Sequence, residues 1–150
     1  MQGGSLPLAG RARSLRQVPR SGGGAAIRVL AVTPHEQDRI SLETILRPPS
    51  CRLVSASCLK EALAMVATQG FSVAICERDL LDGDWKVLLE RLAGMARGPK
   101  LIVCSRLADY RLWGEVLNLG GYDVLITPFV REEVLRIVGQ AAGVMWTVQP

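Results

Sequence analysis

Carboxylates gather directly after one apolar run of this sequence, which is a place where acidic side chains can do chemistry. The run at residues 71–76 reads FSVAIC, and Glu77 follows it at once, with Asp79, Asp82 and Asp84 close behind. In α/β proteins ligands bind beyond the carboxyl ends of parallel strands, so Glu77 could bind a cation or accept a transferred group. The three aspartates lack the rest of a calcium-binding EF-hand loop, and we predict that they form turns and cap helices.

The single histidine stands in a segment that has a simpler structural interpretation. Residues 33–36 read TPHE, a T-x-x-E pattern with proline after the threonine, and this predicts a capping box at the start of the first helix. His35 has no partner at metal-ligand spacing, so we expect it to be an exposed loop residue.

The cysteines and the absent motifs argue against a metal site, a cofactor or an enzyme. The four cysteines form no C-x-x-C pair, and the chain has no dinucleotide, P-loop or G-x-S-x-G motif. Cys76 and Cys104 lie within apolar runs, which is typical of buried thiols in a reducing compartment. We therefore predict reduced core thiols in a cytoplasmic protein that binds no metal or cofactor.

Five short β-rich runs alternate with five segments of helical period, and these elements must position the acids. Four of the runs are almost continuously apolar, which indicates strands buried on both faces of a parallel sheet. The more polar second run suits an edge strand. The predicted strands are residues 27–32, 52–56, 71–76, 101–104 and 124–127. This (βα)5 alternation predicts a doubly wound α/β domain.

The first 26 residues differ in composition from the rest. They hold four arginines, six glycines and no acid, so they carry the whole net charge of +4. We predict a flexible Arg/Gly-rich tail at 1–26, a folded domain at 27–145 and a short C-terminal tail at 146–150. Four charges predict only weak, nonspecific contacts with nucleic acid. No apolar run approaches the roughly 18 residues of a membrane span, and no secretory signal is predicted.

Two motifs, in this order and at this spacing, give the chain a specific resemblance. DLLDGDW (79–85) follows the third predicted strand, and GGYDVLITPF (120–129) contains the fifth. With Ser105 at the end of the fourth strand, the chain resembles the receiver domain of bacterial two-component response regulators over about residues 27–143. The resemblance implies a flavodoxin-like sheet with strand order 2-1-3-4-5, and a cis peptide bond before Pro128.

The resemblance also implies a phosphate switch, whose residues are mostly missing here. The phosphoacceptor position is Glu77, and the acid pair that would hold Mg²⁺ is Thr33 and Pro34. The lysine position is Thr127, and only Ser105, the switch hydroxyl, matches the family pattern. Without the ion or the lysine, phosphoryl transfer loses most of the electrostatic stabilisation on which it depends.

Glu77 itself is open to three interpretations. It is a solvated acid at a strand end, or a fixed charge of about −1 that mimics a phosphoryl group of about −1.5 to −2, or, less favoured, an unusual acceptor. Arg106, directly after Ser105, is the nearest candidate in the sequence for an ion-pair partner of Glu77.

The function expected from the resemblance is that of a stand-alone atypical receiver domain. Such a domain would act in phosphorelay-related signal transduction as a phosphorylation-independent protein-interaction module, and not as an enzyme. Its partners would be other signalling proteins, or a second copy docked through the face of the fourth helix, fifth strand and fifth helix. The alternatives are a working receiver with Glu77 as acceptor, and a small-ligand-binding module that uses the same strand ends.

Overall fold

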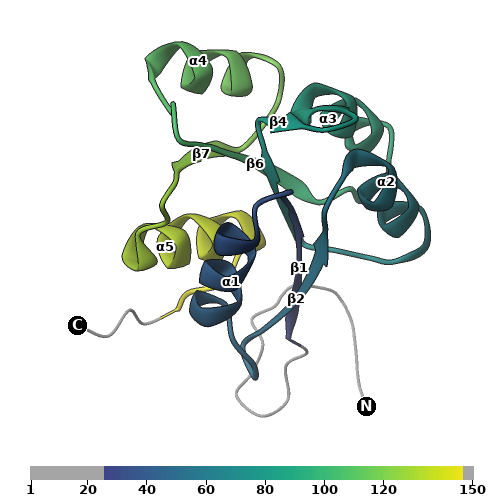
Figure 1. Cartoon of the computed structure of the whole chain (residues 1–150). Helices are drawn as coiled ribbons and strands as arrows, with labels where there is room; N and C mark the ends of the chain where they lie inside the picture. The colour runs from purple at the N-terminus through teal and green to yellow at the C-terminus, as the bar shows by residue number, and fades with distance from the viewer. Residues whose placement is uncertain (1–25, 147–150) are drawn as a thin grey trace.

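A computed structural model describes residues 26–146, which form one parallel β-sheet covered by helices (Figure 1). Its elements in chain order are β1 (Ile27–Val32), α1 (Glu36–Ile45), β2 (Cys51–Ala56), α2 (Leu59–Thr68), β3 (Val73–Glu77), β4 (Asp79–Leu80), β5 (Gly83–Asp84), α3 (Trp85–Ala93), β6 (Lys100–Ser105), α4 (Tyr110–Asn118), β7 (Asp123–Ile126) and α5 (Arg131–Ala142). The predicted alternation of strands and helices is confirmed.

The five-stranded sheet has the order β2-β1-β3-β6-β7, and every neighbouring pair is parallel. Because β4 and β5 form a separate hairpin, β6 and β7 are the fourth and fifth strands of this sheet. The observed order is therefore 2-1-3-4-5, which confirms the predicted doubly wound, flavodoxin-like (βα)5 topology.

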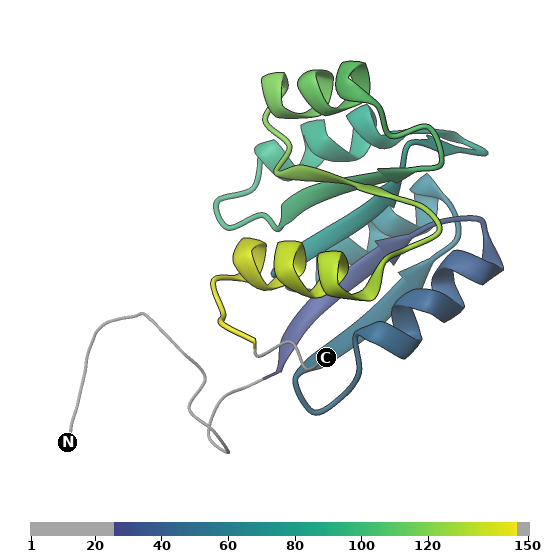
Figure 2. The same ribbon diagram turned by 90° about the vertical axis from the view of Figure 1, so that its left-hand side faces the viewer.

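Both faces of the sheet are buried, as Figure 2 shows in a view turned from that of Figure 1. On one face, Leu30, Ala74 and Val103 pack with α2, α3 and α4. On the other face, Val29, Ile75 and Ile102 pack with α1 and α5. Successive residues of a strand point to opposite faces, so a strand with helices on both sides must be apolar at almost every position.

A short hairpin, β4–β5, follows the central strand and was not predicted from the sequence. Asp79 pairs with Asp84, and Leu80 pairs with Gly83. The predicted capping role of the acids is confirmed for Asp84, which accepts a hydrogen bond from Lys86 N at the start of α3 (3.0 Å). Asp82 caps a different helix, because its two carboxylate oxygens accept hydrogen bonds from Leu59 N (2.8 Å) and Lys60 N (2.9 Å) of α2.

The predicted capping box at the start of α1 is wrong. The helix begins at Glu36 with His35 as its N-cap residue, and no side chain makes the capping hydrogen bond. Thr33 is still part of the strand pairing, because its N–H donates to Ala56 O (3.0 Å). Its hydroxyl therefore accepts a hydrogen bond from His35 N (3.0 Å) and stabilises the turn that leads into the helix.

The predicted domain limits can be compared with the structure in part. The flexible tail predicted for 1–26 falls, apart from Ala26, outside the described residues, as do residues 147–150. Trp146, placed in the C-terminal tail by the sequence, packs against the core formed by α1, α5 and their face of the sheet. Within residues 26–146, every helix falls short of the length and apolar character needed to cross a bilayer.

Candidate functional site

Buried polar side chains gather at the carboxyl ends of the strands. Of the described residues, five polar or charged side chains are buried: Thr33, Asp38, Glu77, Ser105 and Thr127. Four of these residues end or directly follow β1, β3, β6 and β7, and the fifth lies in the first turn of α1. Burying polar groups is unfavourable unless they find partners, so their collection in one place marks this region as the candidate site, here called the strand-end pocket.

Glu77 is the last residue of β3 and lies between the neighbouring strands, where only 7% of its surface is exposed. Burial raises the pKa of its carboxyl, the nearby Asp38 carboxylate raises it further, and His35 opposes these effects. The interpretation of Glu77 as a solvated acid is therefore wrong, because the strand end is covered by the segment that joins β1 to α1.

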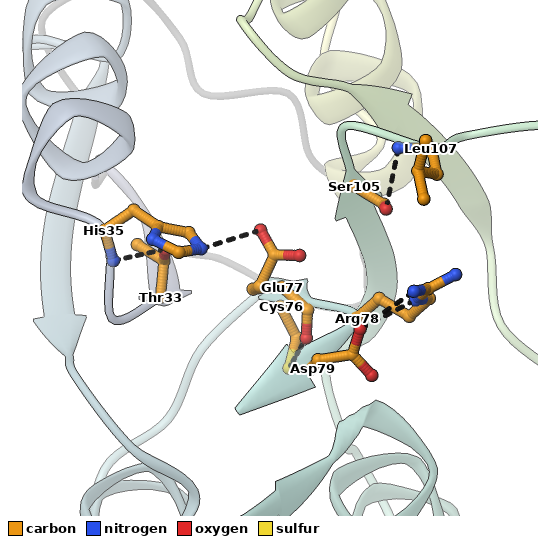
Figure 3. Close-up of polar contacts among 8 residues, drawn as sticks. All are labelled: Thr33, His35, Cys76, Glu77, Arg78, Asp79, Ser105 and Leu107. Atoms are coloured by element: carbon orange, nitrogen blue, oxygen red, sulfur yellow. Dashed lines mark hydrogen bonds and ion pairs between the residues drawn. The ribbon is translucent and has the colours of Figure 1, made fainter. Parts of the chain in front are cut away.

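His35 provides the charged neighbour of Glu77. Its Nε2 atom lies 4.0 Å from Glu77 Oε1, and 48% of its side chain is exposed (Figure 3). The histidine is exposed as predicted, but its ring also faces the pocket, because the N-cap position of α1 directs it toward the end of β3.

The predicted pairing of Arg106 with Glu77 is not present in the structure. Arg106 is exposed on the loop after β6, and among residues 26–146 the only side chain within ion-pair distance of Glu77 is His35. Arg78, the next residue along the chain, pairs instead with Asp79 at 2.9 Å. Neither arginine neutralises Glu77.

The hydroxyl and lysine positions of the pocket lie side by side at the ends of β6 and β7. Ser105 Oγ accepts a hydrogen bond from Leu107 N (3.0 Å), so this hydroxyl holds the first turn of the loop that leads to α4. Thr127 N donates to Ser105 O (3.1 Å), and the Thr127–Pro128 peptide bond is cis, as the resemblance implied.

The residues of the pocket do not fit Mg²⁺. This ion requires near-octahedral oxygen ligands and usually takes one or two carboxylates. Thr33 offers a hydroxyl that already accepts a hydrogen bond, and the Pro34 side chain has no oxygen. Throughout the described part of the chain, no group of three or more His, Cys, Asp or Glu side chains is placed to hold a metal ion.

Asp38 belongs to the pocket but was missed in the sequence. It precedes the buried residues Leu42 and Leu46 by four and eight positions, so it lies on the same face of α1 as they do. An acid on the apolar face of an amphipathic helix is a signal that could have found it.

The thiols beside the pocket are inert structural groups. All four cysteines are free, and Cys51, Cys76 and Cys104 are buried in strands, as predicted for core thiols. Burial raises the pKa of Cys51 to about 11. Burial raises the pKa of Cys104 as well, and the charges of Glu77 and Asp38 add to the effect. These thiols are therefore protonated at neutral pH.

Comparison with known proteins gives matches to structures only. No protein-family model matches the sequence. A search of curated proteins also finds no match. Among solved structures, the signal receiver domain of an HD domain-containing protein from Pseudomonas fluorescens Pf-5 is similar, with 24% identity and a TM-score of 0.71, and the match covers 79% of this chain and 88% of that one.

Two further solved structures lead to the same fold. A putative response regulator from Chloroflexus aurantiacus J-10-fl has 20% identity and a TM-score of 0.73, over 79% of this chain and 98% of that one. The beryllofluoride-activated NtrC4 receiver domain dimer has 24% identity and a TM-score of 0.71, over 77% and 96%. With its five-stranded order, its buried strand-end acid and its cis Thr127–Pro128 bond, this chain has the fold of a response-regulator receiver domain.

Proposed function

We propose that this domain is a phosphorylation-independent protein-interaction module in bacterial signal transduction, acting in the cytoplasm beside other signalling proteins. One observation carries the proposal: the acceptor position is a buried glutamate whose surroundings supply neither an acid pair nor a lysine. Thr33 and Pro34 stand where the resemblance implies the acid pair, and Thr127 stands where it implies the lysine.

Physical reasons make phosphorylation of Glu77 unfavourable. A transferred phosphoryl group adds about −1.5 to −2 charge at neutral pH, and catalysis depends on positive groups that stabilise this charge as it develops. The acidic side chains of Asp38 and Asp79 act on Glu77 as well, and the half-exposed His35 is the only positive candidate within 4.0 Å among the described residues. A further dianion in this pocket would meet repulsion rather than stabilisation.

The test is to incubate the full chain with a small phosphodonor and Mg²⁺ and to measure its intact mass. We expect no mass gain under conditions in which an ordinary receiver domain, treated in the same mixture, is phosphorylated. A gain of one phosphoryl group that disappears in Glu77→Ala would contradict the proposal and support the alternative of an unusual acceptor.

The surface of α4, β7 and α5, here called the α4–β7–α5 face, is the proposed interaction surface. Tyr110 is 91% exposed and Trp113 is 47% exposed, and Ile126 and Val130 are exposed beside them. A hollow of about 550 Å³ is lined by Ala108, Asp109, Tyr110, Trp113, Val124, Ile126 and Glu133. Exposed aromatic side chains around an apolar hollow are typical of protein contacts, and a similar solved structure is described as a receiver domain dimer.

The alternative of a small-ligand module has less support. Four surface hollows of about 300 to 780 Å³ lie beside α5, at the β2 edge, between α4 and β7, and beside the loop from α1 to β2. Neither Ser105 nor Arg106 lines any of them.

A further inference from the structure

Two of the polar atoms in the strand-end pocket have no hydrogen-bond partner. Among the described residues, the buried side-chain atoms without a partner are Asp38 Oδ2, Thr127 Oγ1 and Arg28 Nε. The first two belong to the pocket, and their residues are only 4% and 3% exposed. A buried carboxylate oxygen without a partner is strongly unfavourable, so this acid needs a counter-charge or a proton.

The protein supplies no fixed cation for this purpose. Within residues 26–146, Asp38 forms no ion pair within 4.0 Å, and the partner of Glu77 is a histidine that is charged only when it is protonated. A metal ion is not favoured either, since the donor groups do not gather as three potential ligands. A proton is the one counter-charge that requires no additional space in a packed interior.

We propose that Asp38 and Glu77 together retain one proton at neutral pH, and that the loss of this proton at higher pH loosens the segment from Thr33 to Arg39. The pair then carries one negative charge instead of two. Two carboxyl groups that interact in a buried site cannot both ionise easily, so they titrate as a pair and not as two independent acids.

The other titratable groups around Glu77 come from three parts of the fold. His35 and Asp38 face it from the β1–α1 segment, and Asp79 acts on it from the hairpin. Cys76 of β3 and Cys104 of β6 feel its charge in turn. The cysteines stay neutral because burial raises their pKa, so only His35 can add a positive charge and only the acids can add negative ones.

The direction of the pH effect follows from the raised pKa of Glu77. The folded protein holds the proton more tightly than the unfolded chain does, so this group favours folding below the unfolded pKa. The contribution is lost as the pH rises through the folded pKa. For a single carboxyl, the unfolding equilibrium constant rises at most about tenfold for each pH unit between the two pKa values.

The experiment is urea unfolding of the full chain at a series of pH values from 5 to 9. Glu77→Gln and Asp38→Asn remove one acid each, and Glu90→Gln on the exposed side of α3 is the matched control. We expect the wild type and Glu90→Gln to lose stability in parallel as the pH rises, and each pocket variant to lose markedly less. The double variant should gain little over either single variant, because one proton is shared. Parallel curves for all the proteins would overturn the proposal.

A direct measurement on the wild type keeps the test independent of how the variants fold. Carboxyl ¹³C NMR of the full chain follows the protonation of Asp38 and Glu77 as the pH is changed. We expect one of these two signals, or the pair together, to titrate well above the ordinary range of Asp and Glu. If both carboxyls titrate at or below that range, the pair holds no proton at neutral pH and the proposal is wrong.

Discussion

Cys76, Glu77 and Cys104 lie at adjoining strand ends, where each charge makes the next one harder to form. The charge of Glu77 raises the pKa of both thiols, and burial raises these pKa values more. The same removal from water that raises the pKa of Glu77 therefore keeps its sulfur neighbours protonated. At the scale of residues, the pocket suppresses charge and does not activate a nucleophile.

The first prediction concerns the reactivity of the cysteines toward a thiol reagent at pH 7.5. Only the thiolate reacts, so we expect the buried Cys51, Cys76 and Cys104 to react slowly in the native chain, while the partly exposed Cys58 reacts first. Absorbance of the released chromophore should show one fast equivalent in the native state and four in denaturant. Cys58→Ser should abolish the fast phase, and two or more fast equivalents would contradict the structure.

At the scale of elements, the β4–β5 hairpin connects the loop after Glu77 to a helix that is 22 to 23 residues away in sequence. Asp82 makes this connection through the first two amides of α2, and these amide donors lower the pKa of its carboxyl. Gly83 follows with a φ of 155°, and a Cβ here would lie 2.7 Å from Leu59 Cδ2. A glycine is therefore required where the hairpin approaches α2.

The second prediction is that Asp82→Ala loosens the start of α2. The amides of Leu59 and Lys60 lose their acceptors, so their hydrogen exchange should become several-fold faster, with little change at the centre of β3. Asp79→Ala, at an exposed position of the same hairpin, is the control and should leave both amides protected. Unchanged exchange in Asp82→Ala would show that the cap contributes nothing.

This cap also has a defined pH dependence. Because the pKa of Asp82 is lowered in the folded state, its contribution is present above the unfolded pKa and is lost as the pH falls through the folded pKa. Acid should therefore remove the difference in exchange between the wild type and Asp82→Ala.

The main elements follow from the sequence, whereas the small ones do not. The apolar runs predicted all five strands of the sheet, because a strand covered on both faces has to be apolar throughout. Strands of two residues, such as β4 and β5, are too short to show a period. The start of α1 was misplaced because the hydrogen bond from Thr33 N to Ala56 O extends the strand pairing, and a sequence motif does not show such a contact between distant residues.

The candidate site was predictable only where it follows strand ends. Glu77 and Ser105 end apolar runs, so their shared location follows from parallel pairing. Asp38 lies inside a helix, and its place in the pocket depends on how α1 packs against the sheet. The choice of His35 over Arg106 as the neighbour of Glu77 likewise depends on the direction of two loops.

At the scale of the whole molecule, the two sides of the sheet end in different kinds of surface. The strand-end pocket is closed and polar, whereas the α4–β7–α5 face is open and apolar. A module that works through contacts would use the open face.

The third prediction is that Trp113→Ala and Ile126→Ala weaken binding at this face. Each change removes apolar surface from the rim of the hollow, so partners recovered by the tagged full chain from a lysate of the source organism should decrease together. Sedimentation velocity on the pure chain tests self-association through the same face. Leu81→Ala, which removes an exposed leucine from the hairpin, is the control. Partner recovery and sedimentation that respond equally to all three changes would place the interface elsewhere.

The bond between Asp82 and α2 also bears on the thermodynamics of partner binding. Leu81, almost fully exposed, stands beside Asp82 on a turn that is already fixed by two hydrogen bonds. A partner that contacts this turn would not have to order a free loop, so association would lose little conformational entropy there. Calorimetry on such a complex should then show a more unfavourable binding entropy for Asp82→Ala than for the wild type.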